Sequence, residues 1–529
     1  MGNLIYWLKL SRKTYLLTHS ALATIIANGG LSNVNSLYNA GNCLGNCRNM
    51  SISLIGILVC LGVLGLGRLL GSPLLIGILA ALPFGSTGIG AIGSSTPLLF
   101  TIFELMLVAS VVIRPSGLSG IVMIVRKHWS SWVVIALAVY VVGGAILMPR
   151  LFAGSVTVPG VVGGYSADVL LQPVPGNFNQ ASYFAMGMLT FFAVSVALLN
   201  PHNFVVIKRA FFAFGGINAI LGVADLLGKI AGFSDILSPI RTAAYVMHTG
   251  SSVSGFWRIA GGHTEAAAFA GSALAGVAFC VSYWRATGSR LALWLMLVLG
   301  GLLVLSTSST AYGSIAILSV LLAGSILSSS VRDGLRRRDV ALTGVATAGA
   351  IIILFLAVIS PNVFGSFFDL VYSSIFEKAG SSSGVERAYW NARSLDAFVA
   401  TYGFGIGIGS SRASSWIVAV LSQLGVAGAL LIAILTLIII RGMHGAERGR
   451  VDGEVVAIAN AARAAAIAGL VANSLIGGNA DPGLIFIIAA AVIVQSRALV
   501  FHNPNSNFSQ MPAGPLAALG APPPAGATT

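Results

Sequence analysis

Charged side chains are scarce in this sequence. Asp, Glu, Lys and Arg together make up 8% of its 529 residues, whereas a soluble domain carries roughly 25%. Hydrophobic residues make up 56%, and apolar runs of about 18–20 residues recur along the chain. This composition excludes a soluble globular protein. It predicts an all-α fold, a polytopic transmembrane helical bundle of about 12–14 helices.

Acidic residues are scarcer than basic ones, 15 against 29, which gives a net charge of +14. The basic residues gather in short loops, among them 284–290, 331–340 and 441–454. Because Lys and Arg in short loops are retained in the cytoplasm, we interpret these loops as topology anchors and place the C-terminus in the cytoplasm. No basic surface is then left to assign to nucleic acid, and we expect no nucleic-acid partner.

Cysteine is rare as well, with four residues in the chain. Cys60 and Cys280 fall in apolar runs, where we expect packing roles. Cys43 and Cys47 lie in NCLGNCRN, which lacks the further ligands that a zinc site needs. A local disulfide between them requires an extracytoplasmic location, and the sequence leaves that open.

Motifs for metal or nucleotide chemistry are absent from the sequence. It has no HExxH, no DxD, no second pair of ligands that would complete a zinc site with Cys43 and Cys47, and no Walker loop. The glycines of GFGIGIGSS follow no strand-and-helix pattern of a dinucleotide site. We therefore predict chemistry that needs no metal and no cofactor.

Apolar and polar stretches divide the chain into segments. Ile52–Gly67 and Pro73–Ile89 are predicted to form a tight helical pair, and a helix is predicted from Trp416 to Ile440. The predicted segments, in order, are an N-terminal stretch that is either a first membrane span or a loose extension (1–50), a transmembrane bundle (51–359) with outside loops (149–181 and 233–263), a main outside loop (360–415), C-terminal transmembrane helices (416–497) and a disordered cytoplasmic tail (498–529).

A few charges fall inside predicted membrane helices. Asp225 and Lys229 are four residues apart, so they share a helical face and are predicted to pair with each other. Glu104 either has a functional role or hydrogen-bonds a neighbouring helix, and the sequence favours neither interpretation. Arg463 is the remaining charge of this kind.

The most polar stretch of the chain runs from Ser381 to Gly428. It carries three arginines, two carboxylates, the adjacent aromatics Tyr389 and Trp390 and a ladder of alternating glycines. Arginine beside backbone amides that glycine leaves accessible is one way to hold phosphate or diphosphate. The residues concerned are Arg387, Arg393, Arg412, Glu386, Asp396, Tyr389, Trp390, Gly403, Gly405, Gly407 and Gly409.

Basic residues in outside loops need an explanation, because topology does not require them. A bound phosphate or diphosphate would explain them, since the guanidinium fork matches its oxygens. The alternative is that Glu386 and Asp396 pair with neighbouring arginines on a small amphipathic helix, which leaves Arg258 and Arg412 unexplained. The outside basic residues are Arg241, Arg258, Lys378, Arg387, Arg393 and Arg412.

The second outside loop reads FWRIAGGHTEAAAFAG and brings Arg258, His263 and Glu265 within eight residues. A carboxylate beside arginines at a membrane interface can act as general base for a sugar hydroxyl. The alternative for Glu265 is a structural role in the first turn of a helix, where a negative charge suits the helix dipole. For His263 we favour a structural role.

These motifs resemble a known family. ERAYWNA…YGFGIGIGSSRASSW…LSQLGVAG is similar to the signature of the bacterial O-antigen ligase and polysaccharide polymerase superfamily, and RIAGGHTEAAAFA resembles its second loop. The resemblance covers roughly residues 50–500. The ligase branch usually has a His before the GxxG element, whereas Ser414 and Ser415 stand at those positions here. This departure favours the polymerase branch.

The resemblance implies a type C glycosyltransferase-like fold in the bacterial inner membrane, with its active loops on the periplasmic side. It implies a polyprenyl-diphosphate-linked oligosaccharide as substrate, whose glycan is transferred to a hydroxyl of the next repeat unit. Membrane lipids, a chain-length regulator and export proteins are the implied partners. The residues carried over are Arg387, Arg412 and Glu265 as catalytic and Arg258, Arg393, Tyr389, Gly405, Gly407 and Gly409 as substrate-binding, with no metal ligands.

Two other functions stay open. One is a ligase-type transfer of the glycan to another acceptor. The other is a transporter or flippase for lipid-linked sugars, which predicts inverted repeats, broken helices and charges at the membrane midplane. The sequence shows no internal repeat and few midplane charges, so the polymerase is the favoured hypothesis.

Overall fold

The computed structural model describes residues 50–92, 96–162, 165–233, 235–243, 247–250, 252–253, 256–334, 336–359, 365, 372, 380–443 and 451–500. The first membrane span within 1–49, the Cys43–Cys47 disulfide, Lys378 and most of the predicted tail lie outside these residues. The expectations for these parts stay predictions.

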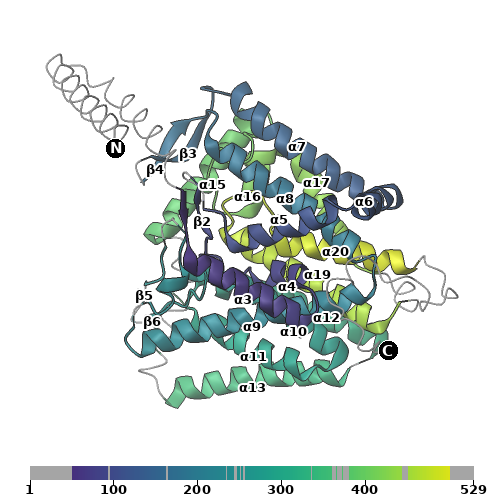
Figure 1. Ribbon diagram of the computed structural model, residues 1–529. Coiled ribbons are helices and arrows are strands. Elements are labelled where there is room, and N and C mark those ends of the chain that lie inside the picture. Colours follow the sequence, from purple (N-terminus) through teal and green to yellow (C-terminus); the bar gives the residue numbers. More distant parts are fainter. Residues whose placement is uncertain are drawn as a thin grey trace, which may run out of the picture. The chain divides into compact units, whose positions relative to one another are not determined.

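The described chain is mostly helical (Figure 1). Its helices are α3 (Leu54–Leu70), α4 (Pro73–Ala80), α5 (Leu99–Val112), α6 (Pro115–Lys127), α7 (Trp129–Leu151), α8 (Pro175–Ala197), α9 (His202–Ile230), η1 (Ser238–Ile240), α10 (Ala266–Thr287), α11 (Arg290–Leu305), α12 (Ser309–Asp333), α13 (Arg337–Ile359), α15 (Ser382–Ala400), α16 (Trp416–Ala419), the π-helix η3 (Val420–Leu424), α17 (Gly425–Arg441), α19 (Gly453–Ile476) and α20 (Leu484–Val500).

In the part of the chain that the structure describes, six short strands form three antiparallel two-stranded ribbons. They pair as β1 (Met50–Ile52) with β2 (Gly90–Ile92), β3 (Thr157–Val162) with β4 (Tyr165–Leu170), and β5 (Ser252–Val253) with β6 (Phe256–Trp257). The chain separates into two compact units, and the β1–β2 ribbon belongs to the unit formed by residues 1–52 and 90–96. The described helices belong to the other unit, residues 53–89 and 97–529.

Seven described helices are long and apolar enough to cross a membrane, and α5 with α6, bent by 94° at Pro115, forms an eighth if the pair counts as one span. The seven are α7, α8, α9, α10, residues 309–331 of α12, the run 416–441 and α19. Shorter apolar helices are α3, α11 and most of α20. The chain is therefore a multi-pass helical membrane protein, as predicted, although fewer of its described helices have full spanning length than the 12–14 helices expected.

Two boundaries differ from the predictions for identifiable reasons. The predicted span Pro73–Ile89 is wrong, because α4 ends at Ala80, just before Pro83 and Gly85, and proline disfavours a helical residue ahead of it. The predicted loop 149–181 is shorter, since α7 continues through Pro149 and α8 already begins at Pro175. Proline at the first helical position needs no N–H partner, so it starts α8 without cost.

The helices pack through small side chains. Figure 1 shows α9, α10 and α11 lying side by side, and α10 also packs along α19. Alanines dominate the buried faces of α10 and α19, which lets two membrane helices approach closely where the lipid gives no hydrophobic driving force. This packing holds the ends of α10 and α19 in place, and the polar loops that carry the predicted site adjoin these helices.

Candidate functional site

The alternating glycines form a turn with a repeated left-handed backbone. The φ angles are +79°, +83°, +84° and +79° at Gly403, Gly405, Gly407 and Gly409, a region that only glycine adopts readily. A Cβ on Gly405 would lie 2.6 Å from the amide nitrogen of Gly425, and one on Gly407 would lie 2.9 Å from the ring of Pro149 in α7. A Cβ on Gly409 would overlap the carbonyl oxygen of Gly176 in α8. The turn is therefore wedged between η3, α7 and the start of α8.

The amides of this turn are engaged within the protein. Gly405 N donates to Thr401 Oγ1 (3.1 Å), and Gly407 N donates to the carbonyl oxygen of Gln423 (3.0 Å). Gly409 N donates to Gln423 Oε1 (3.4 Å). These hydrogen bonds occupy the amides of the turn, and the close approaches of neighbouring backbone explain why glycine stands at these positions. Phosphate binding by Gly405, Gly407 and Gly409 stays a prediction.

The π-helix η3 supplies the acceptors for the glycine turn. It interrupts the apolar run 416–441, which confirms the helix predicted from Trp416 but not its regularity. The carbonyl oxygen of Ser422 accepts a hydrogen bond from Ile406 N in the turn (2.9 Å). The carbonyl oxygen of Leu424 accepts one from Tyr140 Oη of α7 (2.8 Å). Single π-turns inside α-helices are frequent at functional sites. Gly425 follows η3 with a φ of +66°.

Arg412 follows the glycine turn and lies on an aromatic ring. Its guanidinium carbon is 4.6 Å from the ring centroid of Trp390 in α15, a cation–π geometry. Its backbone N–H donates to Pro159 of β3 (3.3 Å). The side chain is exposed, and no described carboxylate forms an ion pair with it. Arg387 lies three residues before Trp390 in α15, so the two residues share a helical face.

Arg393, predicted to bind substrate, is paired with carboxylates of the protein. It lies 2.9 Å from Asp168 of β4 and 3.7 Å from Asp396, and its guanidinium is 5.7 Å from the ring of Tyr389. The pairing with Asp396 was the alternative considered from the sequence, and it is confirmed. Asp168 was missed, because a hairpin far away in the sequence supplies it. Substrate binding by Arg393 and Tyr389 stays a prediction.

A buried ion network holds the loop that carries Arg258. Asp225 and Lys229 pair in α9 at 2.9 Å, as predicted. Asp225 Oδ2 also accepts from the backbone N–H groups of Ala260 (2.7 Å) and Gly261 (3.1 Å), and Lys229 Nζ donates to the carbonyl oxygen of Arg258 (2.6 Å). These bonds fix the backbone on both sides of Ile259. The pair is thus a support for the loop at 258–261.

Arg241 belongs to the same network, which corrects the expectation that it binds an external ligand. It is buried, pairs with Asp235, lies 3.5 Å from Asp225 and donates to the carbonyl oxygen of Gly261 (2.6 Å). The sequence places Arg241 in an outside loop but cannot show that the loop folds back onto α9. Its charge is therefore neutralised internally.

Glu265 and Arg387 both lie within electrostatic reach of Arg258. Burial lowers the pKa of Arg258; the negative charge of Glu265 opposes this shift and the positive charge of Arg387 adds to it. Nε of Arg258 is buried without a hydrogen-bond partner in the described structure. Glu265 precedes α10 as its N-cap residue, yet its side chain makes no capping hydrogen bond. Glu265 therefore makes no side-chain cap, but its position at the N-terminus of α10 agrees with the dipole alternative, and its role stays open between the two interpretations.

His263 is a buried, neutral residue between Arg258 and Glu265 in the sequence. Burial, together with the charge of Arg241, lowers its pKa to about 4. Its ring lies edge-on to Phe269 at 6.3 Å, and its Nε2 has no partner among the described residues. This environment agrees with the structural role favoured from the sequence.

Two further intramembrane charges have polar neighbours. Glu104 is only 4% exposed in α5, and the charge of Asp481, in the loop before α20, acts on it. Arg463 of α19 donates to the carbonyl oxygen of Ile440 at the end of α17 (3.3 Å). Arg463 therefore joins the middle of α19 to the end of α17, whereas the role of Glu104 stays open between the two interpretations.

The helices and this cluster define a multi-pass membrane protein with a basic, carboxylate-containing site formed by two polar loops. Comparison of the chain with family models, with curated proteins and with solved structures found no match. The family resemblance described above therefore stays a prediction.

Proposed function

We propose that this protein polymerises lipid-linked polysaccharide repeat units at the periplasmic face of the bacterial inner membrane, within exopolysaccharide, capsule or O-antigen synthesis. The observation that carries the proposal is that Glu265 and Arg387, from segments far apart in the sequence, both act electrostatically on Arg258. Arg412 lies over the ring of Trp390, which shares a helical face with Arg387. It adds a further cation without an ion-pair partner among the described residues. Several cations beside one carboxylate suit a reaction in which diphosphate leaves a sugar.

The reaction proposed is a transfer of glycan between two lipid-linked chains. A hydroxyl oxygen of the acceptor repeat attacks the anomeric carbon of the donor glycan and forms the new glycosidic bond. The bond from that carbon to the diphosphate oxygen breaks, and the electron pair leaves with polyprenyl diphosphate. The hydroxyl proton passes to the carboxylate of Glu265, which acts as general base.

The arginines have separate tasks in this mechanism. Arg387 and Arg412 hold the diphosphate and stabilise the charge that develops as it leaves. Arg258 has a lowered pKa because of burial, yet it stays protonated, since arginine does not lose its proton in proteins. Its backbone is fixed by Lys229, so its position is set before substrate binds, which reduces the cost of ordering.

The test is complementation of a strain that lacks this gene, with surface glycan separated on a gel. Arg387→Ala and Arg387→Lys, at membrane levels equal to wild type, should both lose long chains and keep single-repeat material, because lysine lacks the bidentate fork. Arg290→Ala removes an exposed arginine at the start of α11 and is the control. Normal polymer from both Arg387 variants would refute the proposed site.

The same strain separates the alternative functions. Polymer of normal length that is not attached to its final acceptor would indicate a ligase. Purified protein in liposomes that moves lipid-linked sugar across the bilayer without chain growth would indicate a transporter.

A further inference from the structure

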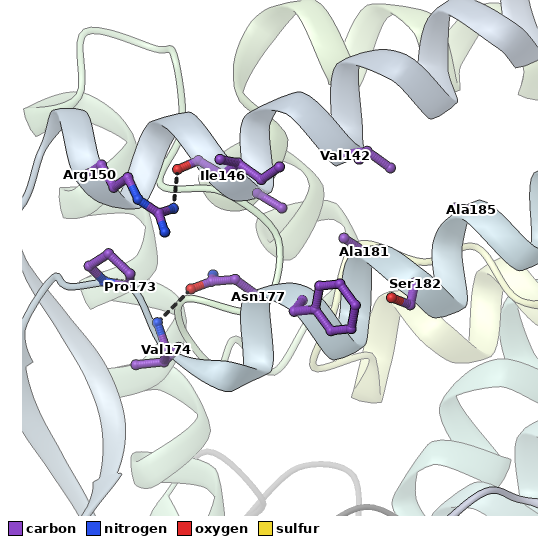
Figure 2. Close-up of a pocket in the computed structure, with 11 residues that line it drawn as sticks. Val142, Ile146, Arg150, Pro173, Val174, Asn177, Ala181, Ser182 and Ala185 are labelled. Carbon is purple, nitrogen blue, oxygen red and sulfur yellow. Dashed lines mark hydrogen bonds between the residues drawn. The ribbon is translucent and has the colours of Figure 1, made fainter.

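A groove of about 320 Å³ lies between α7 and α8, two of the membrane-spanning helices. Figure 2 shows Arg150 and Pro173 at one end of the groove and Val142 and Ala185 at the other. Val142 and Arg150 are eight residues apart on α7, so at 1.5 Å per residue the groove is about 12 Å long. That length suits one extended hydrocarbon chain rather than a compact polar ligand.

Small side chains create the space on the α8 side. Ala181, Ser182 and Ala185 line it there, and Val142 and Ile146, one turn apart, line it on α7. Apart from the Ser182 hydroxyl, these are hydrocarbon surfaces within two membrane spans. An apolar groove that opens between spans is filled by lipid chains, since water would leave this surface poorly solvated.

Arg150 gives one end of the groove a positive charge. The side chain is exposed, and it donates to the carbonyl oxygen of Ile146 in its own helix (2.6 Å). A cation in the last turn also suits the helix dipole, which is a structural reason for it. The guanidinium has five N–H donors, however, and no described carboxylate forms an ion pair with Arg150. An anion of the bound molecule matches the donors that remain.

The arginine end of the groove adjoins the glycine turn. Asn177, which lines the groove, donates from Nδ2 to the carbonyl oxygen of Ile408 (2.8 Å) and to Ser410 Oγ (2.7 Å). Its Oδ1 accepts from Val174 N (2.8 Å), so the whole amide is engaged and its position is fixed. A head group held at Arg150 would thus lie beside the turn that leads to Arg412.

We propose that this groove binds the hydrocarbon chain of a lipid phosphate and that Arg150 pairs with the phosphate. The apolar walls of the groove match the hydrocarbon chain, and the positive charge of Arg150 at one end matches the phosphate. A neutral lipid would leave this charge without a partner. The identification of the occupant with the lipid carrier of the glycan rests on the proposed function; lipid-phosphate binding itself does not.

A second groove provides a matched comparison. It has a volume of about 220 Å³ and is lined by apolar residues of α5 to α8, among them Val112 and Leu189. No charged residue lines it. A lipid chain in this second groove would find no partner for its phosphate. A variant that fills the second groove should therefore leave the protein's preference for a charged head group unchanged.

The test measures binding of a polyprenyl monophosphate, and of the uncharged polyprenol of equal length, to the purified protein by native mass spectrometry. Wild type should prefer the phosphate. Arg150→Gln should lower phosphate affinity at least about tenfold and leave alcohol affinity unchanged, because only the charge-assisted hydrogen bonds are lost. Ala181→Trp should weaken the binding of both ligands, because the larger side chain fills the groove. If Ala181→Trp does not fold, Ser182→Leu replaces it as the groove-filling variant. Val112→Trp and Arg290→Gln are the controls.

The outcomes are distinct for the two proposals. If wild type, Arg150→Gln and the groove-filling variants bind the phosphate with equal affinity, the groove proposal is refuted, regardless of the polymer that the cells produce. If lipid-phosphate binding depends on the groove but deletion of the gene leaves the polymer unchanged, the polymerase proposal is refuted and the groove proposal stands. Arg387→Ala should retain groove binding while it stops chain growth.

Discussion

Lys229 and Asp225 form a buried ion pair in α9, and each partner also holds the loop at 258–261. Lys229 Nζ lies 2.9 Å from Asp225 Oδ2 and 2.6 Å from the carbonyl oxygen of Arg258, while the same Oδ2 accepts from the amides of Ala260 and Gly261. The position of Arg258 therefore depends on two charges inside a membrane helix.

Asp225→Asn should destabilise the protein by about 3–5 kcal/mol, because it leaves the buried charge of Lys229 without a counter-ion. Asp225→Asn combined with Lys229→Met should recover part of this loss, since no unpaired charge remains. Thermal unfolding in detergent measures both. Asp396→Asn is the control, because it removes an exposed ion pair at 3.7 Å that is worth at most about 1 kcal/mol. Equal effects of Asp225→Asn and Asp396→Asn would contradict the role of the network.

Gly409→Ala should be far more damaging than Gly154→Ala, although both glycines have positive φ, +79° and +72°. A Cβ at Gly154 meets nothing within 4 Å, whereas one at Gly409 overlaps the carbonyl oxygen of Gly176. Backbone strain alone costs about 1–2 kcal/mol, and overpacking at Gly409 adds about 1–3 kcal/mol. The comparison needs thermal stability and membrane level of the two variants. Similar values for both would show that the close approach of the turn to α8 does not exist.

Glu265→Gln should lower polymer formation by about 10²–10⁴-fold, the usual contribution of a general base. Because the Glu265 side chain makes no capping hydrogen bond, thermal stability should stay within about 0.5 kcal/mol of wild type. Complementation and unfolding measurements on the same preparation separate the two effects. A variant that is unstable but active when folded would assign Glu265 a structural role.

Stability should fall as the pH drops from about 6.5 toward 4, because His263 is neutral in the folded protein. Its pKa is lowered from its usual 6.5 to about 4, so over this interval the unfolded chain binds a proton that the folded protein does not, which favours unfolding. The limiting loss is roughly 3 kcal/mol. Unfolding temperatures of wild type and His263→Gln at pH 7 and pH 5 test this. The variant should lose less stability between the two values, and an equal loss would place the titrating group elsewhere.

Composition and spacing were sufficient for part of this structure. The low charge content predicts a multi-pass helical protein, and the spacing of Asp225 and Lys229 predicts their pairing, because both properties are local. The loop motif also places Arg258 and Glu265 near each other. That Arg387 acts electrostatically on Arg258 was expected only through the family resemblance, since their proximity depends on how two segments far apart in the sequence fold.

The remaining features depend on partners that local sequence does not identify. The glycines at 405, 407 and 409 suggest accessible amides, but the acceptors that engage them come mostly from Gln423, in a π-turn without a sequence pattern of its own. Arg241 and Arg393 look like ligand-binding arginines until Asp225 and Asp168 are placed beside them. Non-local ion pairs of this kind decide which arginines are left for a substrate.

The backbone contacts of the glycine turn also bear on how related chains would diverge. The turn meets α8 and η3 through main-chain atoms, so mutation of neighbouring side chains cannot relieve an added Cβ. Ile406 and Ile408 between the glycines are fully buried, and other apolar residues of similar volume would fill the same space. Under the proposed function, a lineage that changes its sugar specificity should keep these glycines, while substitutions accumulate at the exposed positions of α15.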